Sequence, residues 1–263
     1  MNPRAGIAKE LIPTCNFVAN NGFVTFSLYI LGMFKTIQLF LLIAASFVCG
    51  TAFAARPMMT DDARIVDPQS CQLESWVKTY QHHDEYWALP ACNPLGFFEL
   101  TVGGSKVTGE DRSTPSDRVI QAKTIFRELK PNGWGIGLAV GNSHHFSTNQ
   151  NRSNHDLYSY VPITWSFNDD QQLIHLNFGG AKKELDHSFK RTWGLGSEFQ
   201  VAPNTYLIAE TFGEDAVKPS YQAGIRHWLM PNRFQVDLTT GTKSSYNTQN
   251  RWFSMGIRLL FGN

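Results

Sequence analysis

The sequence predicts an all-β fold, a transmembrane antiparallel up-and-down β-barrel of about 12 strands that follows a cleaved signal peptide. Two observations favour this fold class. Apolar side chains recur at every second position in segments of about ten residues, and no helical pattern of useful length follows residue 54. The connections between the segments alternate between tight turns and longer polar loops, which is typical of an outer-membrane barrel with its short turns in the periplasm.

The alternation is clearest in residues 133–141, where Trp134, Ile136, Leu138 and Val140 share one face and the other face is glycine and alanine. We expect strands near residues 71–82, 85–91, 96–105, 117–130, 133–142, 156–167, 172–181, 190–201, 204–213, 219–229, 232–241 and 249–261. The expected long loops are residues 106–116, 143–155, 182–189, 214–218 and 242–248. An even number of strands places both ends of the barrel in the periplasm.

An export signal precedes the predicted barrel. Residues 33–54 contain a lysine, an apolar stretch and small residues ending at Ala54, which is the layout of a signal peptide cleaved after that residue. The apolar stretch is shorter than the roughly 20 residues of a spanning helix, and an uncleaved N-terminal anchor is the alternative. The expected parts of the chain are an upstream extension (1–32, with translation starting at Met33), the signal peptide (33–54), a periplasmic lead-in (55–70) and the barrel (71–263).

Charge and cysteine content narrow the expected partners. The chain has 23 Lys and Arg against 22 Asp and Glu, so no basic field exists to attract nucleic acid. Of four cysteines, Cys71 and Cys92 follow the predicted cleavage site. Because export leads to an oxidising compartment, we expect a disulfide between them at the periplasmic end of the first hairpin. Two free thiols are the alternative.

The apolar face of each strand must meet lipid, since a charge at mid-bilayer costs roughly 2 to 4 kcal/mol. The opposite face then lines the lumen, where charges of both signs are expected to pair. A soluble β-sandwich or lipocalin-like barrel in the periplasm would alternate in the same way and is the competing fold. Parity assigns six charged residues to the lumen, as candidates that set selectivity: Lys123, Arg127, Glu198, Arg226, Asp237 and Arg258.

The start of the predicted mature chain resembles that of a known family. Residues 56–62 read RPMMTDD, a polar link covers residues 63–70, and Gln72-Leu73-Glu74 begins the first strand. This order is similar to that of the proteobacterial phenol-degradation meta-pathway family of outer-membrane barrels. The resemblance implies an outer-membrane transporter or channel over the whole mature chain. Cys71 and the EYWALPAC stretch of residues 85–92 depart from the family pattern and indicate a distinct subgroup.

Motifs for catalysis are weak. The chain has no GxSxG, HExxH, paired CxxC or phosphate-binding glycine loop. His145-Phe146-Ser147 matches the His-x-Ser order of outer-membrane lipid hydrolases, but a serine is activated only beside an oriented histidine. The pair is expected on the lumen side rather than the lipid face. We therefore predict no enzyme activity, with a lipid hydrolase as the least favoured alternative.

Histidines gather at the loop-side ends of the predicted strands, at positions 82, 83, 144, 145, 155 and 187. A transition metal binds where several histidines converge, but these positions are also ordinary for exposed loops. No metal or cofactor is predicted. The expected partners are outer-membrane lipids, the barrel-assembly machinery and a small-molecule solute.

Two functions from different classes remain. The first is passage of a small solute through the lumen, with a bias to anions set by Lys123, Arg127, Arg226 and Arg258. A barrel of about 12 strands is intermediate between side-chain-filled barrels and wide porins. The second is a closed structural or binding barrel, its lumen filled by ion pairs, that acts through its extracellular loops.

Overall fold

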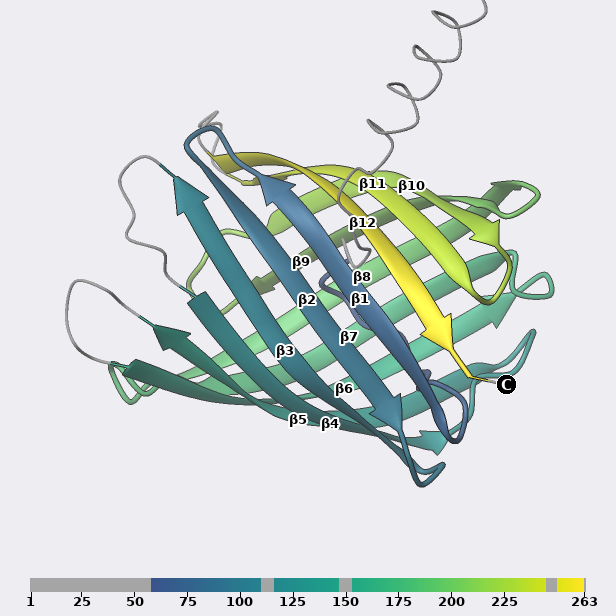
Figure 1. Cartoon of the computed structure of the whole chain (residues 1–263), viewed down its shortest axis with the longest axis horizontal. Coiled ribbons are helices and arrows are strands. Elements are labelled where there is room, and N and C mark those ends of the chain that lie inside the picture. Colours follow the sequence, from purple (N-terminus) through teal and green to yellow (C-terminus); the bar gives the residue numbers. More distant parts are fainter. Residues whose placement is uncertain (1–57, 110–115, 147–152, 245–249, 263) are drawn as a thin grey trace, which may run out of the picture. The chain divides into compact units, whose positions relative to one another are not determined.

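Twelve antiparallel strands make up the part of the chain that the computed structural model describes, residues 58–109, 116–146, 153–244 and 250–262 (Figure 1). All of these residues belong to one unit, residues 53–263. The strands are β1 (Ser70–Thr79), β2 (His83–Asn93), β3 (Phe98–Gly109), β4 (Ser116–Arg127), β5 (Trp134–Phe146), β6 (Ser153–Phe167), β7 (Gln172–Lys182), β8 (Phe189–Ala202), β9 (Thr205–Glu214), β10 (Ser220–Met230), β11 (Phe234–Lys243) and β12 (Arg251–Phe261).

Each strand pairs with its neighbour in sequence, and β1 pairs with β12 to close the sheet into a barrel. The closing register runs from Cys71 opposite Phe261 to Thr79 opposite Phe253. Closure leaves no sheet edge, so every strand pairs on both sides, as a spanning sheet requires. The predicted all-β up-and-down barrel is confirmed. Among the described residues no helix is long and apolar enough to cross a membrane.

The two ends of the barrel carry different connections. One end, the N-terminal rim, holds the start of β1, the end of β12 (marked C in Figure 1) and the connections 94–97, 128–133, 168–171, 203–204 and 231–233. The other end, the loop rim, holds the described connections 80–82, 183–188 and 215–219, together with the strand ends Gly109, Ser116, Phe146, Ser153, Lys243 and Arg251. The contrast in length is smaller than expected, because polar residues also join the sheet. For example, β5 and β6 take in most of the loop predicted over residues 143–155.

The two faces of the sheet differ as the alternation predicts. Large apolar side chains lie exposed on the outside of many strands, among them Ile120, Val140, Leu195, Ile225 and Phe253. The inward positions are instead polar and buried, among them Glu99, Gln121, Lys123, His175, Glu198, Glu210, Gln235 and Asp237. An apolar outer band around a polar interior is the pattern of a barrel that stands in lipid.

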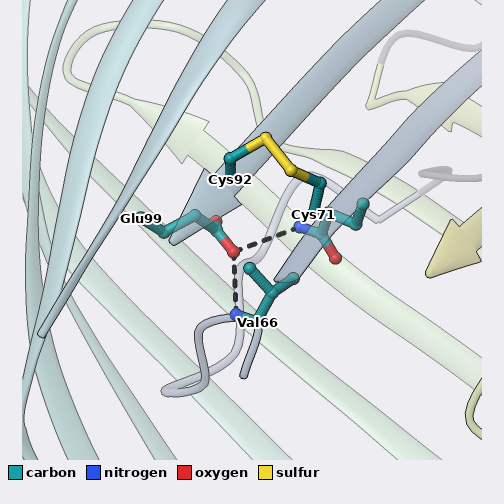
Figure 2. Close-up of a disulfide and its surroundings, with 5 residues drawn as sticks. Val66, Cys71, Cys92 and Glu99 are labelled. Atoms are coloured by element: carbon teal, nitrogen blue, oxygen red, sulfur yellow. Dashed lines mark hydrogen bonds between the residues drawn. A yellow bond between two sulfur atoms is a disulfide. The ribbon is translucent and has the colours of Figure 1, made fainter. Parts of the chain in front are cut away.

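Cys71 and Cys92 lie directly opposite each other on β1 and β2 and form a disulfide. The predicted pairing is therefore confirmed. Figure 2 shows the bridge beside Glu99 and Val66, where the chain enters the first strand. The inward neighbours of the two cysteines, Gln72 and Ala91, are buried, so alternation turns the bridge itself to the outer face of the first hairpin.

Candidate functional site

Most of the segment before β1, residues 58–66, lies inside the barrel. Met58, Thr60, Ala63 and Val66 are each at most 4% exposed, although no strand pairs with the segment in the closed order. Their burial is instead due to the surrounding strands. We call residues 58–66 the lumen segment.

Opposite walls of the barrel hold the two ends of the lumen segment. At its start, the backbone N–H groups of Met59 and Thr60 each donate to the Glu210 carboxylate on β9 at 2.7 Å. At its end, the Val66 N–H donates to Glu99 on β3 at 3.0 Å (Figure 2). In the closed order, five strands separate β3 from β9 in either direction. The lumen segment therefore crosses the full width of the barrel.

Side chains of the wall satisfy the backbone of the lumen segment along its course. The Ala63 N–H donates to Thr164 Oγ1 on β6 at 2.9 Å, and Val66 O accepts from Asn93 Nδ2 at 2.8 Å. These partners replace a β-ladder, which is how buried backbone groups outside regular structure avoid an unpaired state. A segment held by side chains alone is separable from the sheet.

Glycine on β8 makes room for the lumen segment. A Cβ atom on Gly194 would lie 2.6 Å from Thr60 Oγ1, and one on Gly196 would lie 2.7 Å from the Met58 terminal methyl carbon. Real Cβ atoms do not approach that closely. A larger residue at position 194 would push against the short Thr60 side chain, whereas the flexible Met58 side chain can move away from one at position 196.

Lys123 on β4 neutralises the two carboxylates of the lumen segment. Its Nζ lies 2.8 Å from Asp61 and 3.5 Å from Asp62, and Tyr160 also donates its hydroxyl to Asp61 at 2.7 Å. Burial by itself would raise the pKa of Asp62, but the positive charges of Lys123, Arg258 and Arg64 outweigh it and hold the pKa below its ordinary value. Asp62 is therefore kept as an anion inside the barrel.

A chain of polar contacts continues from the lumen segment into the wall. Thr164 Oγ1, which accepts from Ala63, lies 3.0 Å from His175 Nδ1, and His175 Nε2 lies 3.2 Å from Glu198 Oε1. Glu198 also accepts from Arg226 at 2.6 Å.

Arg226 on β10 extends the network to Asp237 on β11. Its Nη2 donates to Asp237 Oδ2 at 2.7 Å, and Asp237 itself is fully buried. A guanidinium that bridges two carboxylates in this way is among the stronger polar contacts in proteins. The network therefore fixes the wall beside the lumen segment.

The space left between these groups is small. Arg258 donates to Gln72 Oε1 at 2.7 Å and lies 3.7 Å from Glu74. These three side chains fill the lumen beside β1. The remaining cavity has a volume of about 50 Å³, and lumen-segment and wall residues line it together. A water molecule occupies roughly 10 to 15 Å³ on this measure, so the cavity holds a few waters and no larger solute. The lumen is closed at this level.

Five of the six predicted lumen residues lie in this interior. Lys123, Glu198, Arg226 and Arg258 line the cavity, and Asp237 lies behind Arg226. They pair with carboxylates of the wall and of the lumen segment, so mutual pairing extends to a part of the chain beyond the strands.

Arg127 is the exception, and its assignment to the lumen is wrong. The pairing of β4 with β5 shifts between Ile125 and Arg127, and this irregularity reverses the alternation at the end of the strand. Arg127 is exposed, its guanidinium lies 4.1 Å from the centre of the Trp134 ring, and its Nε donates to the Trp134 carbonyl. The residue belongs to the outer surface of the N-terminal rim.

The sequence reasoning missed Glu99 and Glu210, the two carboxylates that hold the lumen segment. A usable signal was present, because both occupy inward positions in otherwise apolar strands, as Glu198 does. It also missed His175 and Thr164, whose roles depend on contacts between distant strands.

The His145-Phe146-Ser147 hypothesis is tested only in part, because Ser147 lies outside the described residues. His145 Nδ1 lies 2.8 Å from Asp117 and its Nε2 lies 3.6 Å from Asp156. The ring therefore contacts carboxylates on the two strands that flank β5, namely β4 and β6. In the described ranges, no three His, Cys, Asp or Glu side chains are grouped so as to hold a metal ion.

Comparisons with known proteins agree with the barrel. A family model described as "Uncharacterised conserved protein UCP029691" matches residues 42–261. Among curated proteins, none matches the chain. Similar solved structures include "KdgM porin in complex with disordered oligogalacturonate" (TM-score 0.54, 10% identity, 73% of this chain and 99% of that chain), "KdgM porin" (0.52, 9%, 73% and 99%) and the NanC porin (0.50, 9%, 73% and 100%). At these identities the likeness shows the fold alone.

Proposed function

The chain belongs to the UCP029691 family, and we propose that it is an outer-membrane channel for small polar solutes that the lumen segment holds closed. The observation that carries the proposal is the way the passage is blocked. The wall of the lumen is polar, and the obstacle across it is a chain segment bound through hydrogen bonds and one ion-paired lysine. A filled structural barrel needs no separable obstacle.

The proposed resting state places the N-terminal rim in the periplasm. An export signal over residues 33–54 delivers the chain, the lead-in then enters the barrel from that rim, and the even strand number returns the C-terminus to it. The resemblance to the phenol-degradation meta-pathway family, whose members are described as transporters or channels, agrees with this function. The resemblance also gains a physical reason, since the described part of the shared stretch, residues 58–62, forms most of the lumen segment.

The expected bias to anions is withdrawn from the proposal. It rested on Lys123, Arg127, Arg226 and Arg258, but Arg127 lies outside and the others face carboxylates. Glu99 and Glu210 add further buried carboxyl groups to the wall. We expect an opened lumen of mixed charge that passes small polar solutes of either sign. Oligogalacturonate, the ligand in one of the similar porin structures, is a suitable first large solute to test.

The second candidate is a closed barrel that acts through its extracellular loops. The observation that favours it is the small volume, about 50 Å³, of the cavity between the lumen segment and the wall. A lipid hydrolase stays the least favoured function, and unchanged phospholipid and lipid A profiles on overexpression are the expected result.

Conductance separates the two candidates. The refolded mature protein is placed in a planar bilayer, beside a variant that lacks residues 55–66. The channel proposal expects rare openings of the mature protein and frequent openings of the shortened one. If neither protein gives single-channel events at any voltage, the barrel is closed and the channel proposal fails. A band that shifts on heating in gel electrophoresis shows that each protein is folded.

A further inference from the structure

Five neighbouring strands each place one basic residue on the outer face near the loop rim. The residues are Lys106 on β3, Arg118 on β4, His144 on β5, His155 on β6 and Lys182 on β7. Alternation along each strand puts these residues on the same outward face as exposed apolar side chains. Arg118 shares its face with Ile120, and His144 shares its face with Val140. We call these five residues the basic row.

The register of the sheet makes the basic row continuous. Arg118 lies directly opposite His144, and His144 lies directly opposite His155. Lys106 is two positions from Gly104, the partner of Arg118, and Lys182 pairs with Leu157, two positions from His155. Lys106, Arg118 and Lys182 are cations at pH 7, and the two histidines between them can donate hydrogen bonds from their rings. The row therefore favours an anionic partner that lies across several strands.

The described residues offer little internal compensation for the row. Among them, Lys106, Arg118 and Lys182 form no salt bridge. Two carboxylates lie near the row: Asp84 on β2 pairs with Thr108, two positions from Lys106, and Glu184 accepts the His155 backbone N–H. The Arg118 guanidinium lies 4.7 Å from the centre of the Phe146 ring. His144 Nε2 is shielded and has no hydrogen-bond partner in the described part of the chain.

An outward arginine elsewhere on this rim is treated differently. Arg191 on β8 lies 2.9 Å from Asp215, and its hydrogen bond to that carboxylate holds the pKa of Asp215 below its ordinary value. The chain therefore supplies a counter-ion where an outward cation stands alone. Within the described ranges no carboxylate forms an ion pair with Lys106, Arg118 or Lys182, which lie near the loop rim.

We propose that the basic row binds the phosphate groups of outer-leaflet lipid, namely those of lipid A in lipopolysaccharide. Guanidinium and ammonium groups form charge-assisted hydrogen bonds with phosphate oxygens, and basic pockets on membrane proteins bind anionic headgroups. Several cations along one row suit a headgroup that carries more than one phosphate. The inference uses the outer-membrane placement and is independent of conduction through the lumen.

Native mass spectrometry of the refolded mature protein tests the proposal, with bisphosphorylated lipid A and its dephosphorylated form as probes. The row variant is Lys106→Gln/Arg118→Gln/Lys182→Gln. The matched control, Arg191→Gln/Lys243→Gln/Arg251→Gln, removes the same charge from other strands near the same rim. We expect the row variant to lose about tenfold or more in affinity for bisphosphorylated lipid A, while the control keeps the wild-type affinity.

Three results would overturn the proposal: equal binding of the dephosphorylated lipid, wild-type affinity in the row variant, or an equal loss in the control. Heat-shifted gel bands confirm that both variants fold. Conductance is measured in bilayers without lipid A, so failure of lipid binding and failure of the channel proposal are separate outcomes.

Discussion

Replacement of Glu210 by glutamine isolates the contact that holds the start of the lumen segment. The Glu210 carboxylate accepts the Met59 and Thr60 N–H groups at 2.7 Å each, and Gln222 donates to it at the same distance. Glutamine has the same size and shape, so packing inside the barrel changes little. It carries no charge, however, and only one of its two terminal atoms accepts a hydrogen bond.

The expected size of the effect follows from those contacts. A hydrogen bond to a charged group contributes about 1.5 to 3 kcal/mol. Glu210→Gln removes one of the two and weakens the other, so the closed state should lose about 2 kcal/mol relative to the open one. Since 1.4 kcal/mol is a factor of ten, the equilibrium constant for opening should rise by about 30-fold.

Single-channel recording measures this change as open probability. Glu214→Gln is the matched control, because Glu214 lies on the same strand and its carboxylate is 3.8 Å from Lys183 near the loop rim. We expect frequent openings of Glu210→Gln and wild-type behaviour of Glu214→Gln. An unchanged open probability in Glu210→Gln, or an equal rise in the control, would refute the role given to the lumen segment.

Three further predictions address the segment, the disulfide and pH. Gly194→Ala should open the channel, because the new Cβ would collide with Thr60; open probability measures it. The Cys71→Ser/Cys92→Ser variant should lose about 3 kcal/mol of unfolding free energy, since the bridge joins residues 21 apart; urea titration measures it. Asp62 has a lowered pKa, so its stabilising charge is present above its ordinary pKa and is lost only as pH falls through the lower folded value. The channel should therefore stay closed from pH 7 to pH 5.

Each of these predictions has its own control. For Gly194→Ala the control is Gly213→Ala on β9, where a new Cβ would meet the Trp193 ring at an ordinary 3.4 Å; equal opening of both would contradict the collision. For the cysteines, wild-type conductance of the double serine variant is expected, and an unchanged urea midpoint would contradict the bridge. A higher open probability of the wild-type channel at pH 5 than at pH 7 would show that another group controls closure.

Much of the barrel was predictable because its rules are local. Alternation along residues 133–141 fixed which side of β5 faces out, and the same rule placed Lys123, Glu198 and Asp237 inside. Arg127 escaped the rule because one irregularity in the β4–β5 register reverses all later positions of the strand. A single sequence gives no sign of that shift, since Phe126 and Arg127 are both ordinary residues for a strand end.

The candidate site was less predictable because it depends on contacts over long separations. The polar stretch before β1 was expected near the periplasmic mouth, and nothing local indicates that Glu210, about 150 residues later, receives its backbone. Strand order alone brings β3 and β9 to opposite walls, and only the closed barrel reveals that one short segment can reach both. The two aspartates gave the best hint. An acidic pair in the lead-in could neutralise a lysine that alternation places inside the barrel.

The charge on Lys123 connects closure to the chemistry of the lumen. With the lumen segment in place, Lys123 faces two carboxylates within 3.5 Å and is nearly fully buried. When the segment leaves, the same lysine loses these two partners and retains only the more distant carboxyl group of Glu99, so its burial becomes more costly. Water and a passing anion would then be its replacement partners, so release of the segment and hydration of the lumen should occur as one step. For the proposed channel, this coupling would favour the closed state and would provide a polar, hydrated lumen once the segment is released.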